Sequence, residues 1–125
     1  MENIRVLMFI GFGSFIGGVV RYLLSKYIHL NFFSFISWGT FIVNVLGCLL
    51  IGIVSGYFDR GRMSEEWRQF IAIGILGGFT TFSAFSNETL FLLRNGQSGP
   101  AFCYVLLTVL VGLCATFLGY LVVNN

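Results

Sequence analysis

The sequence predicts an all-α integral membrane protein, with residues 1–125 forming one domain of four transmembrane helices. Its composition is 57% hydrophobic and only 10% charged, with a mean hydropathy of +0.90. Residues 6–20, 27–58, 69–87 and 95–125 also carry no charged side chain. These runs hold four crossings, because each crossing needs about 20 apolar residues. Too little sequence remains for a soluble catalytic, nucleotide-binding or receptor domain, and the net charge of +2 gives no basis for a nucleic-acid partner.

The four spans are expected at residues 4–27, 38–58, 67–94 and 100–123. Between them lie a short aromatic loop at 29–37, a charged loop at 59–68 and a polar turn at 95–100. Trp38, Trp67 and Tyr57 fall near predicted span ends, where aromatic side chains gather at the membrane surface. Arg21 lies less than two turns inside the end of the first span, so its side chain is expected to snorkel or to find a polar partner.

The basic residues give the spans little orientational bias. Four arginines fall on one side of the membrane and three basic residues on the other: Arg5, Arg60, Arg62 and Arg68 against Arg21, Lys26 and Arg94. Such a balance predicts insertion in both orientations and an antiparallel dimer. Burial of Arg21 would change the count to four against two and weaken that prediction.

Glycines at four-residue spacing predict close contact between helices. Gly13 precedes Gly17, and Gly52 precedes Gly56, by one helical turn. Small residues at this spacing let helix backbones approach each other, and close packing alone is the favoured interpretation. A transport path through so small a bundle would be narrow or would lie between subunits.

The third span contains the densest polar motif, Gly77-Gly78-Phe79-Thr80-Thr81-Phe82-Ser83-Ala84-Phe85-Ser86-Asn87-Glu88. Two glycines followed by two threonines weaken a helix, so we expect a break here in mid-membrane. A half-helix starting near Thr80 would present free N–H groups to an anion, and carbonyls released at the break could bind a cation.

Several side chains in and around this motif are candidate ion ligands. Phe82 and Phe85 share a helix face, and their ring edges could accept a small anion, although packing is the commoner role of such a pair. Asn44, an amide within the second span, indicates either a functional contact or a helix-to-helix hydrogen bond. Tyr104 and Thr108 form a hydroxyl stripe with Thr116, unless the threonines bond to their own helix backbone. Glu88 is interpreted as interfacial because Arg94 is near.

Three segments together closely resemble the Fluc (CrcB) fluoride channels: the third-span motif, Gly39-Thr40-Phe41-Ile42-Val43-Asn44, and Gly17-Gly18-Val19-Val20-Arg21-Tyr22. The resemblance covers nearly the whole chain. It implies a multi-pass protein of the bacterial plasma or inner membrane, built as an antiparallel dual-topology homodimer. Such a dimer would have two fluoride pores and a structural sodium ion at its centre.

The resemblance also implies a role for individual residues. Phe82 and Phe85 would direct ring edges at fluoride, Asn44 would be the pore amide, and Arg21 would lie in the vestibule. Hydroxyls of the pore would come from Thr81, Ser83, Tyr104 and Thr108. The carbonyls of Gly77 and Thr80 from both subunits would bind the sodium. Ala84 and Gly112 depart from the family pattern, which commonly has a hydroxyl residue at these two positions.

A passive fluoride channel has a clear physical use. Fluoride enters a cell as its neutral acid and is trapped inside as the ion, so a selective pore would let it leave. The alternative is a small four-span proton-coupled cation or multidrug exporter, which would need a carboxylate that residues 4–27 do not contain. A non-transporting assembly subunit would leave Asn44 and the broken third span without a purpose. No cluster of catalytic side chains appears, so the chain is not expected to be an enzyme.

Overall fold

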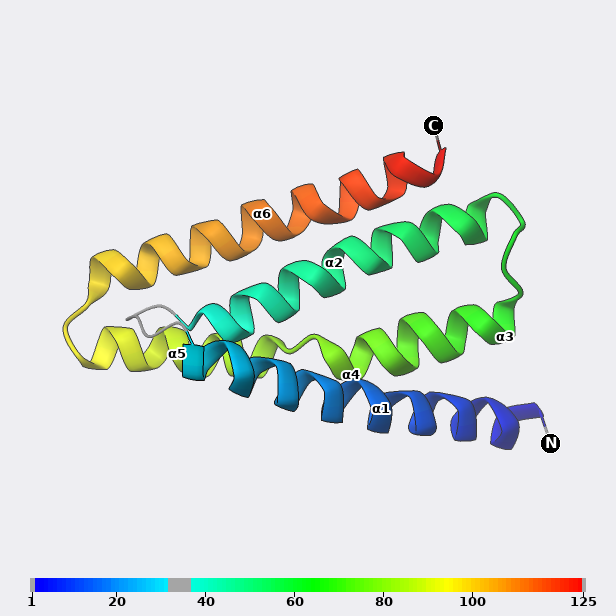
Figure 1. The fold of residues 1–125 in the computed structure, drawn as a ribbon, viewed down its shortest axis with the longest axis horizontal. Helices are drawn as coiled ribbons and strands as arrows, with labels where there is room; N and C mark the ends of the chain where they lie inside the picture. The colour runs from blue at the N-terminus through cyan, green and yellow to red at the C-terminus, as the bar shows by residue number, and fades with distance from the viewer. Residues whose placement is uncertain (1, 32–36, 125) are drawn as a thin grey trace.

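The computed structural model describes residues 2–31 and 37–124, and these residues form an all-helical bundle. Four helical segments are long and apolar enough to cross a membrane: Asn3–Asn31, Trp38–Asp59, Glu65–Arg94 and Ser98–Asn124. The segments lie side by side and run alternately back and forth, with the two termini toward the same end (Figure 1). The predicted all-α, four-span architecture is confirmed.

The first, second and fourth spans are continuous helices: α1 (Glu2–Asn31), α2 (Trp38–Asp59) and α6 (Ser98–Asn124). α1 continues through His29, which the sequence had placed in the first loop, because nothing between Tyr27 and Asn31 stops a helix. Residues 32–36 of that predicted loop lie outside the described residues. α2 packs mainly on α6, whereas α1 packs mainly on the first half of the third span.

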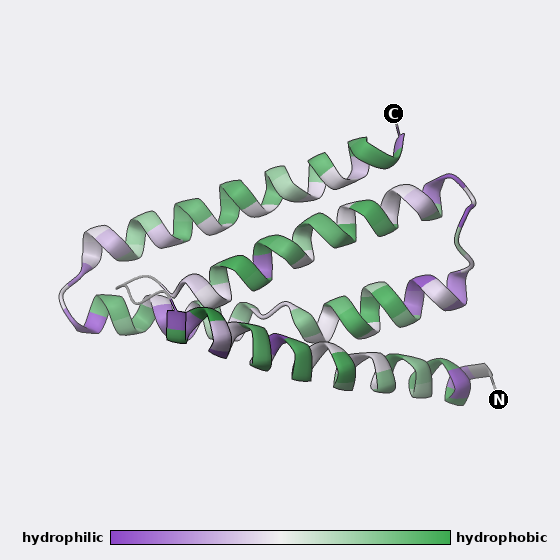
Figure 2. Ribbon diagram, viewed as in Figure 1, coloured by the Kyte–Doolittle hydropathy of each residue, from purple (hydrophilic) through white to green (hydrophobic). Residues whose placement is uncertain are grey.

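The apolar side chains of this bundle point largely outward. Hydrophobic residues cover the length of the helices, and hydrophilic residues gather mainly at their ends and in the turns (Figure 2). In the four spans only 11% to 28% of the most apolar window is buried. Such a surface is stable in a lipid bilayer, where apolar exposure costs no hydration free energy.

Glycines bring the helices into backbone contact. A Cβ at Gly17 would overlap the carbonyl oxygen of Ile75, and a Cβ at Gly78 would lie 2.5 Å from the carbonyl oxygen of Ser14. On the other side of the bundle, a Cβ at Gly52 would overlap the carbonyl oxygen of Thr116. The prediction of close packing at the spaced glycines is confirmed.

Gly17→Ala is expected to lower the free energy of unfolding by about 1–3 kcal/mol, the usual cost of overpacking. The added methyl group would push α1 away from the third span, because the atom it meets belongs to the backbone and cannot rotate away. Denaturant titration of the detergent-solubilised protein measures the change. Gly11→Ala is the matched control, since a Cβ there meets nothing within 4 Å. Equal stability of the two variants would contradict the contact.

The third span is assembled from four short elements. It starts with α3 (Glu65–Arg68), continues as the π-helical segment η1 (Gln69–Leu76) and α4 (Gly77–Phe79), and ends with α5 (Phe82–Arg94). Between α4 and α5, Thr80 and Thr81 have extended dihedral angles, with ψ of 154° and 115°. Gly77 and Gly78, where the sequence placed the weak point, are helical.

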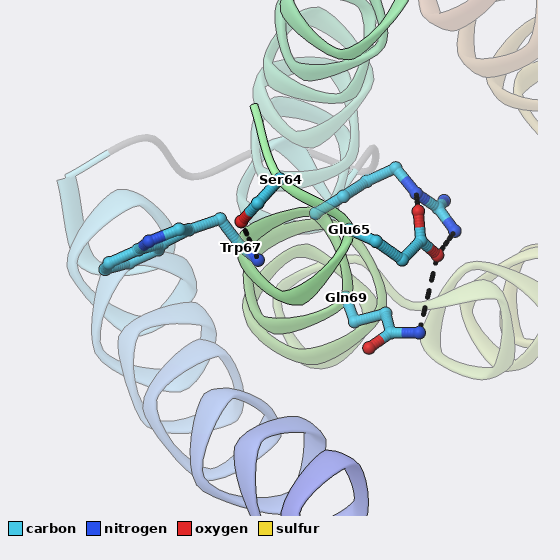
Figure 3. Close-up of polar contacts among 5 residues, drawn as sticks. Ser64, Glu65, Trp67 and Gln69 are labelled. Atoms are coloured by element: carbon cyan, nitrogen blue, oxygen red, sulfur yellow. Dashed lines mark hydrogen bonds and ion pairs between the residues drawn. The ribbon is translucent and has the colours of Figure 1, made fainter. Parts of the chain in front are cut away.

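A polar cap fixes the start of the third span at the edge of the apolar region (Figure 3). Ser64 Oγ accepts a hydrogen bond from the Trp67 N–H at 3.3 Å, which satisfies one free donor of the first turn. Glu65 forms an ion pair with Arg68, with a shortest N–O distance of 2.6 Å, and accepts a further bond from Gln69. These groups anchor the helix end that leads toward the membrane interior.

Candidate functional site

The site begins at Thr81, whose backbone is bound by the side chain of Asn44. The Thr81 N–H donates to Asn44 Oδ1 at 2.9 Å, and Asn44 Nδ2 donates to the Thr81 carbonyl at 3.1 Å. In a continuous helix the Thr81 N–H would instead bind the carbonyl of Gly77. The amide of α2 therefore replaces helix hydrogen bonds at membrane depth, where an unpaired backbone group costs several kcal/mol. This contact matches the helix-to-helix interpretation of Asn44, and among the described residues only one of the two Nδ2 hydrogens is used.

Arg21, on α1, binds a backbone group at the same interruption. Its Nε donates to the carbonyl of Gly78 at 3.1 Å, and the side chain is partly buried. A continuous helix would pair that carbonyl with the N–H of Phe82. The predicted polar partner of Arg21 is thus a backbone carbonyl within the bundle. Without Arg21, the count of basic residues at the two membrane surfaces becomes four arginines on one side against Lys26 and Arg94 on the other.

Thr80 and Thr81 end one helix and begin the next. The Thr80 hydroxyl donates back to the Leu76 carbonyl at 3.0 Å. The Thr81 hydroxyl accepts a bond from the Ala84 N–H at 3.2 Å and lies 3.1 Å from the Ser83 hydroxyl. Thr81 is therefore the N-cap of α5, whose positive dipole end points into the middle of the span.

The two phenylalanines of α5 differ sharply in exposure. Phe82 is 78% exposed, whereas Phe85 is buried. Their rings meet edge to face with centroids 5.5 Å apart, and the Phe85 ring also lies 5.3 Å from that of Tyr104. Phe85 is held by packing within the subunit, and Phe82 projects out of it.

Glu88 binds two hydroxyls that its neighbours in the sequence did not indicate. Thr40 Oγ1 and the Tyr104 hydroxyl each donate to one of its carboxylate oxygens at 2.7 Å. Tyr104 is fully buried and Thr40 is 7% exposed. The interfacial interpretation of Glu88 stays a prediction; its hydrogen-bond partners in the structure are these two hydroxyls rather than the neighbouring Arg94. The missed signal was Thr40, a hydroxyl one turn before Asn44.

Glu88→Ala is expected to destabilise the bundle by about 1–3 kcal/mol for each hydroxyl left unpaired. Glu88→Gln should cost less, because an amide still offers one acceptor and one donor to Thr40 and Tyr104. Thermal unfolding in detergent measures the difference. Glu66→Ala is the control, since that exposed carboxylate makes only a 3.4 Å ion pair with Arg5. Equal losses in Glu88→Ala and Glu66→Ala would show that the buried hydroxyls do not depend on Glu88.

A groove of about 370 Å³ gathers most of the predicted site residues. It is lined by Gly77, Thr80, Thr81, Phe82, Phe85, Asn44 and Thr108. Tyr104 lies behind Phe85 and is bound to Glu88, and Ser83 and Arg21 do not line this groove. Thr116 donates to the Gly112 carbonyl of its own helix at 3.2 Å, as the alternative for the threonine stripe predicted. The Thr108 hydroxyl, in contrast, is buried and has no hydrogen-bond partner among the described residues.

The lining of this groove is mainly apolar, with few polar groups available to an ion. Within residues 2–31 and 37–124, no group of three His, Cys, Asp or Glu side chains is placed to hold a metal. The polar side chains that line it are those of Asn44, Cys48, Thr80, Thr81 and Thr108. The rings of Phe82 and Phe85 also line it.

These features define the chain as a multi-pass membrane protein in which a mainly apolar groove adjoins the extended residues Thr80 and Thr81 of the third span. A family model described as CrcB-like protein, Camphor Resistance (CrcB), matches residues 8–120. The chain belongs to this CrcB-like family, and the resemblance stated from its motifs is confirmed.

Curated relatives match over nearly their whole length. A protein named fluoride-specific ion channel FluC from Phocaeicola vulgatus is 42% identical over 91% of this chain and 93% of its own. Proteins of the same name from Flavobacterium psychrophilum and from a strain of Thermus thermophilus are 39% and 40% identical, over 97% and 90% of this chain and 98% and 89% of their own. These relatives are named as channels, which confirms the expectation that the chain is not an enzyme. With four spans and bacterial relatives, it is a multi-pass bacterial membrane protein.

Proposed function

We propose that this chain is a fluoride-selective channel that lets fluoride leave the cell passively and so lowers its cytoplasmic concentration. The observation that carries the proposal is the groove in which Asn44, Phe82 and Phe85 surround the N-cap of α5. The names of the three relatives support fluoride as the transported ion.

The groove supplies groups that replace the water around a small anion. Fluoride is strongly hydrated, so a filter must offer hydrogen-bond donors in exchange for lost water. The second Nδ2 hydrogen of Asn44, the Thr108 hydroxyl and the positive end of α5 are such groups, and Thr81 adds a hydroxyl at the first turn of α5. Ser83 would add a further hydroxyl beside that of Thr81, outside the groove of one subunit. The ring edges of Phe82 and Phe85 would provide weakly positive walls for a small anion.

Two subunits complete the path in this proposal, arranged as an antiparallel dual-topology homodimer. Phe82 is 78% exposed beside the polar residues of the groove, and a second copy would cover it. In a two-fold dimer both subunits use the same surface, so the Phe82 of each subunit would reach the path in the other subunit. The groove supports this arrangement more strongly than the charge count does, now that Arg21 is bound within the bundle.

Sodium is proposed as a structural ion at the centre of that dimer. Hard cations prefer oxygen ligands, and Gly77 and Thr80 line the groove with carbonyls next to the interruption. The Gly77 carbonyl fits this role because the Thr81 N–H, its helical donor, binds Asn44 instead. Gly77 and Thr80 of both subunits would hold the ion, and it would stabilise the pairing of the two interruptions.

The cation-exporter alternative has less support. A proton-coupled exporter needs a carboxylate that exchanges protons with its substrate, and the residues from Ile4 to Tyr27 contain none. Glu88 is the one carboxylate within residues 69–124, and both its oxygens accept bonds from hydroxyls of the same subunit.

A cellular assay tests the proposed export. Bacteria that lack their own fluoride exporters should grow in acidic medium with fluoride when they express this chain, and should fail when they express Phe82→Ile. Matched cultures with toxic organic cations test the alternative exporter. Protection against those cations, with none against fluoride, would refute the channel and support the exporter. Cysteine labelling that finds one orientation in the membrane would remove the dual-topology dimer.

A further inference from the structure

Three cysteines lie within the described helices, and only one of them faces the groove. Cys48 is half-buried in α2 and lines the groove one helical turn after Asn44. Cys103 and Cys114 are exposed on α6 and do not line it. The chain therefore carries one thiol at the candidate path and two thiols on the outer surface.

The Cys48 thiol lies beside a gap in the side chains of α6. A Cβ placed on Gly112 would be 3.4 Å from Cys48 Sγ, so the sulfur occupies the space next to this glycine. Thr108, one turn earlier on α6, lines the same groove. The stripe of hydroxyl side chains on α6 is interrupted at Gly112, which has no side chain. The Cys48 thiol, which comes from α2, places a polar group at this point.

The Thr108 hydroxyl gives independent evidence that an ion or a water molecule binds in this part of the groove. Its hydroxyl oxygen is buried and has no hydrogen-bond partner among the described residues. A buried hydroxyl without a partner costs about 1–3 kcal/mol, which favours a bound ion or water at this point. Asn44, Cys48 and Thr108 are therefore three polar groups facing one groove, and a thiol is itself a weak hydrogen-bond donor.

We propose that Cys48 lines the fluoride path between α2 and α6, and that it is a modification site at which a small adduct closes the path. This inference rests on the proposed function. A path narrow enough to select fluoride leaves no room beside an added methylthio group, because selectivity requires the walls to contact the ion.

Methyl methanethiosulfonate is a suitable probe, because it is small, neutral and able to enter the bilayer. The Cys48 thiolate attacks the sulfenyl sulfur, a new S–S bond forms, and the S–SO2 bond breaks. Methanesulfinate leaves with the electron pair, and the thiol proton goes to buffer. Dithiothreitol reverses the reaction by reducing the mixed disulfide.

The experiment compares reconstituted Cys103→Ala/Cys114→Ala, in which Cys48 is the sole thiol, with Cys48→Ser, which keeps the two outer thiols. Each variant's fluoride efflux is compared with its own untreated rate, and mass spectrometry counts the adducts. Treatment should slow efflux through the Cys48-only protein by about tenfold or more, since an occluded filter does not conduct. Dithiothreitol should restore the rate. Modified Cys48→Ser should keep its untreated rate.

Three results would overturn the inference. One is unchanged efflux from protein in which Cys48 is fully modified, and another is a Cys48 that never reacts while Cys103 and Cys114 do. The third is a block that accompanies dissociation on size-exclusion chromatography. In each case conduction by the untreated protein leaves the proposed channel function standing. Absence of fluoride flux from untreated, folded protein would refute the channel and this inference together.

Discussion

Phe82→Ile and Phe85→Ile are each expected to abolish fluoride flux while the protein stays folded. Isoleucine keeps an apolar side chain of similar bulk but has no ring edge to attract an anion. The two rings contact each other edge to face at 5.5 Å, so losing either one removes part of the same positively polarised wall. Efflux from liposomes, recorded with a fluoride electrode, measures the loss.

Phe102→Ile and Phe117→Ile are matched controls for these substitutions. Both side chains lie on α6 and are 66% and 62% exposed, but neither lines the groove. The control variants should conduct as the unsubstituted protein does. Unchanged flux in both Phe82→Ile and Phe85→Ile would refute the ring-edge role.

Asn44→Leu is expected to remove both fluoride flux and part of the stability. The substitution leaves the Thr81 N–H and carbonyl without the amide that binds them, at about 1–3 kcal/mol for each unpaired group. It also removes the amide hydrogen proposed to face the ion. Denaturant titration in detergent and fluoride efflux from liposomes measure the two effects separately.

Asn95→Leu is the control for Asn44→Leu. Asn95 is exposed and donates to the Phe91 carbonyl at the end of its own helix, at 2.7 Å. Its replacement should leave flux intact and change stability by less than Asn44→Leu does. If Asn44→Leu matched this control in both measurements, the contact between α2 and Thr81 would contribute to neither stability nor fluoride flux.

The sequence predicts the four spans well because span formation depends on local composition. Runs without charge and with sufficient length determine which segments enter a bilayer, whatever their partners are. Close glycine contacts are also predictable, since Gly13 and Gly17 fall on one helix face and so meet the same neighbour.

The position of the extended residues in the third span is less predictable from the sequence. The sequence pointed to Gly77 and Gly78, yet both are helical, and the extended residues are Thr80 and Thr81. Gly78 is instead the point of closest approach to Ser14. The Thr81 backbone is fixed by Asn44, 37 residues away, and a contact of that range cannot be read from local propensity.

Glu88 shows the same limit for the site. From the sequence its nearest charged neighbour was Arg94, whereas the structure gives it two hydroxyls, from Thr40 and Tyr104, that lie 48 and 16 residues away. Asn44, Phe82 and Phe85 could be selected from their residue types and positions. Their shared groove depends on the packing of α2, α5 and α6, which composition does not specify.

Anion efflux from liposomes that contain the purified protein tests the central claim most directly. Fluoride and chloride electrodes record the same vesicles after ionophore releases the opposing potential. A selective channel predicts rapid loss of fluoride with negligible loss of chloride, and no fluoride loss from vesicles with Phe82→Ile. Folded protein that releases neither ion, or both at similar rates, would contradict a fluoride-selective path at Asn44 and Phe82.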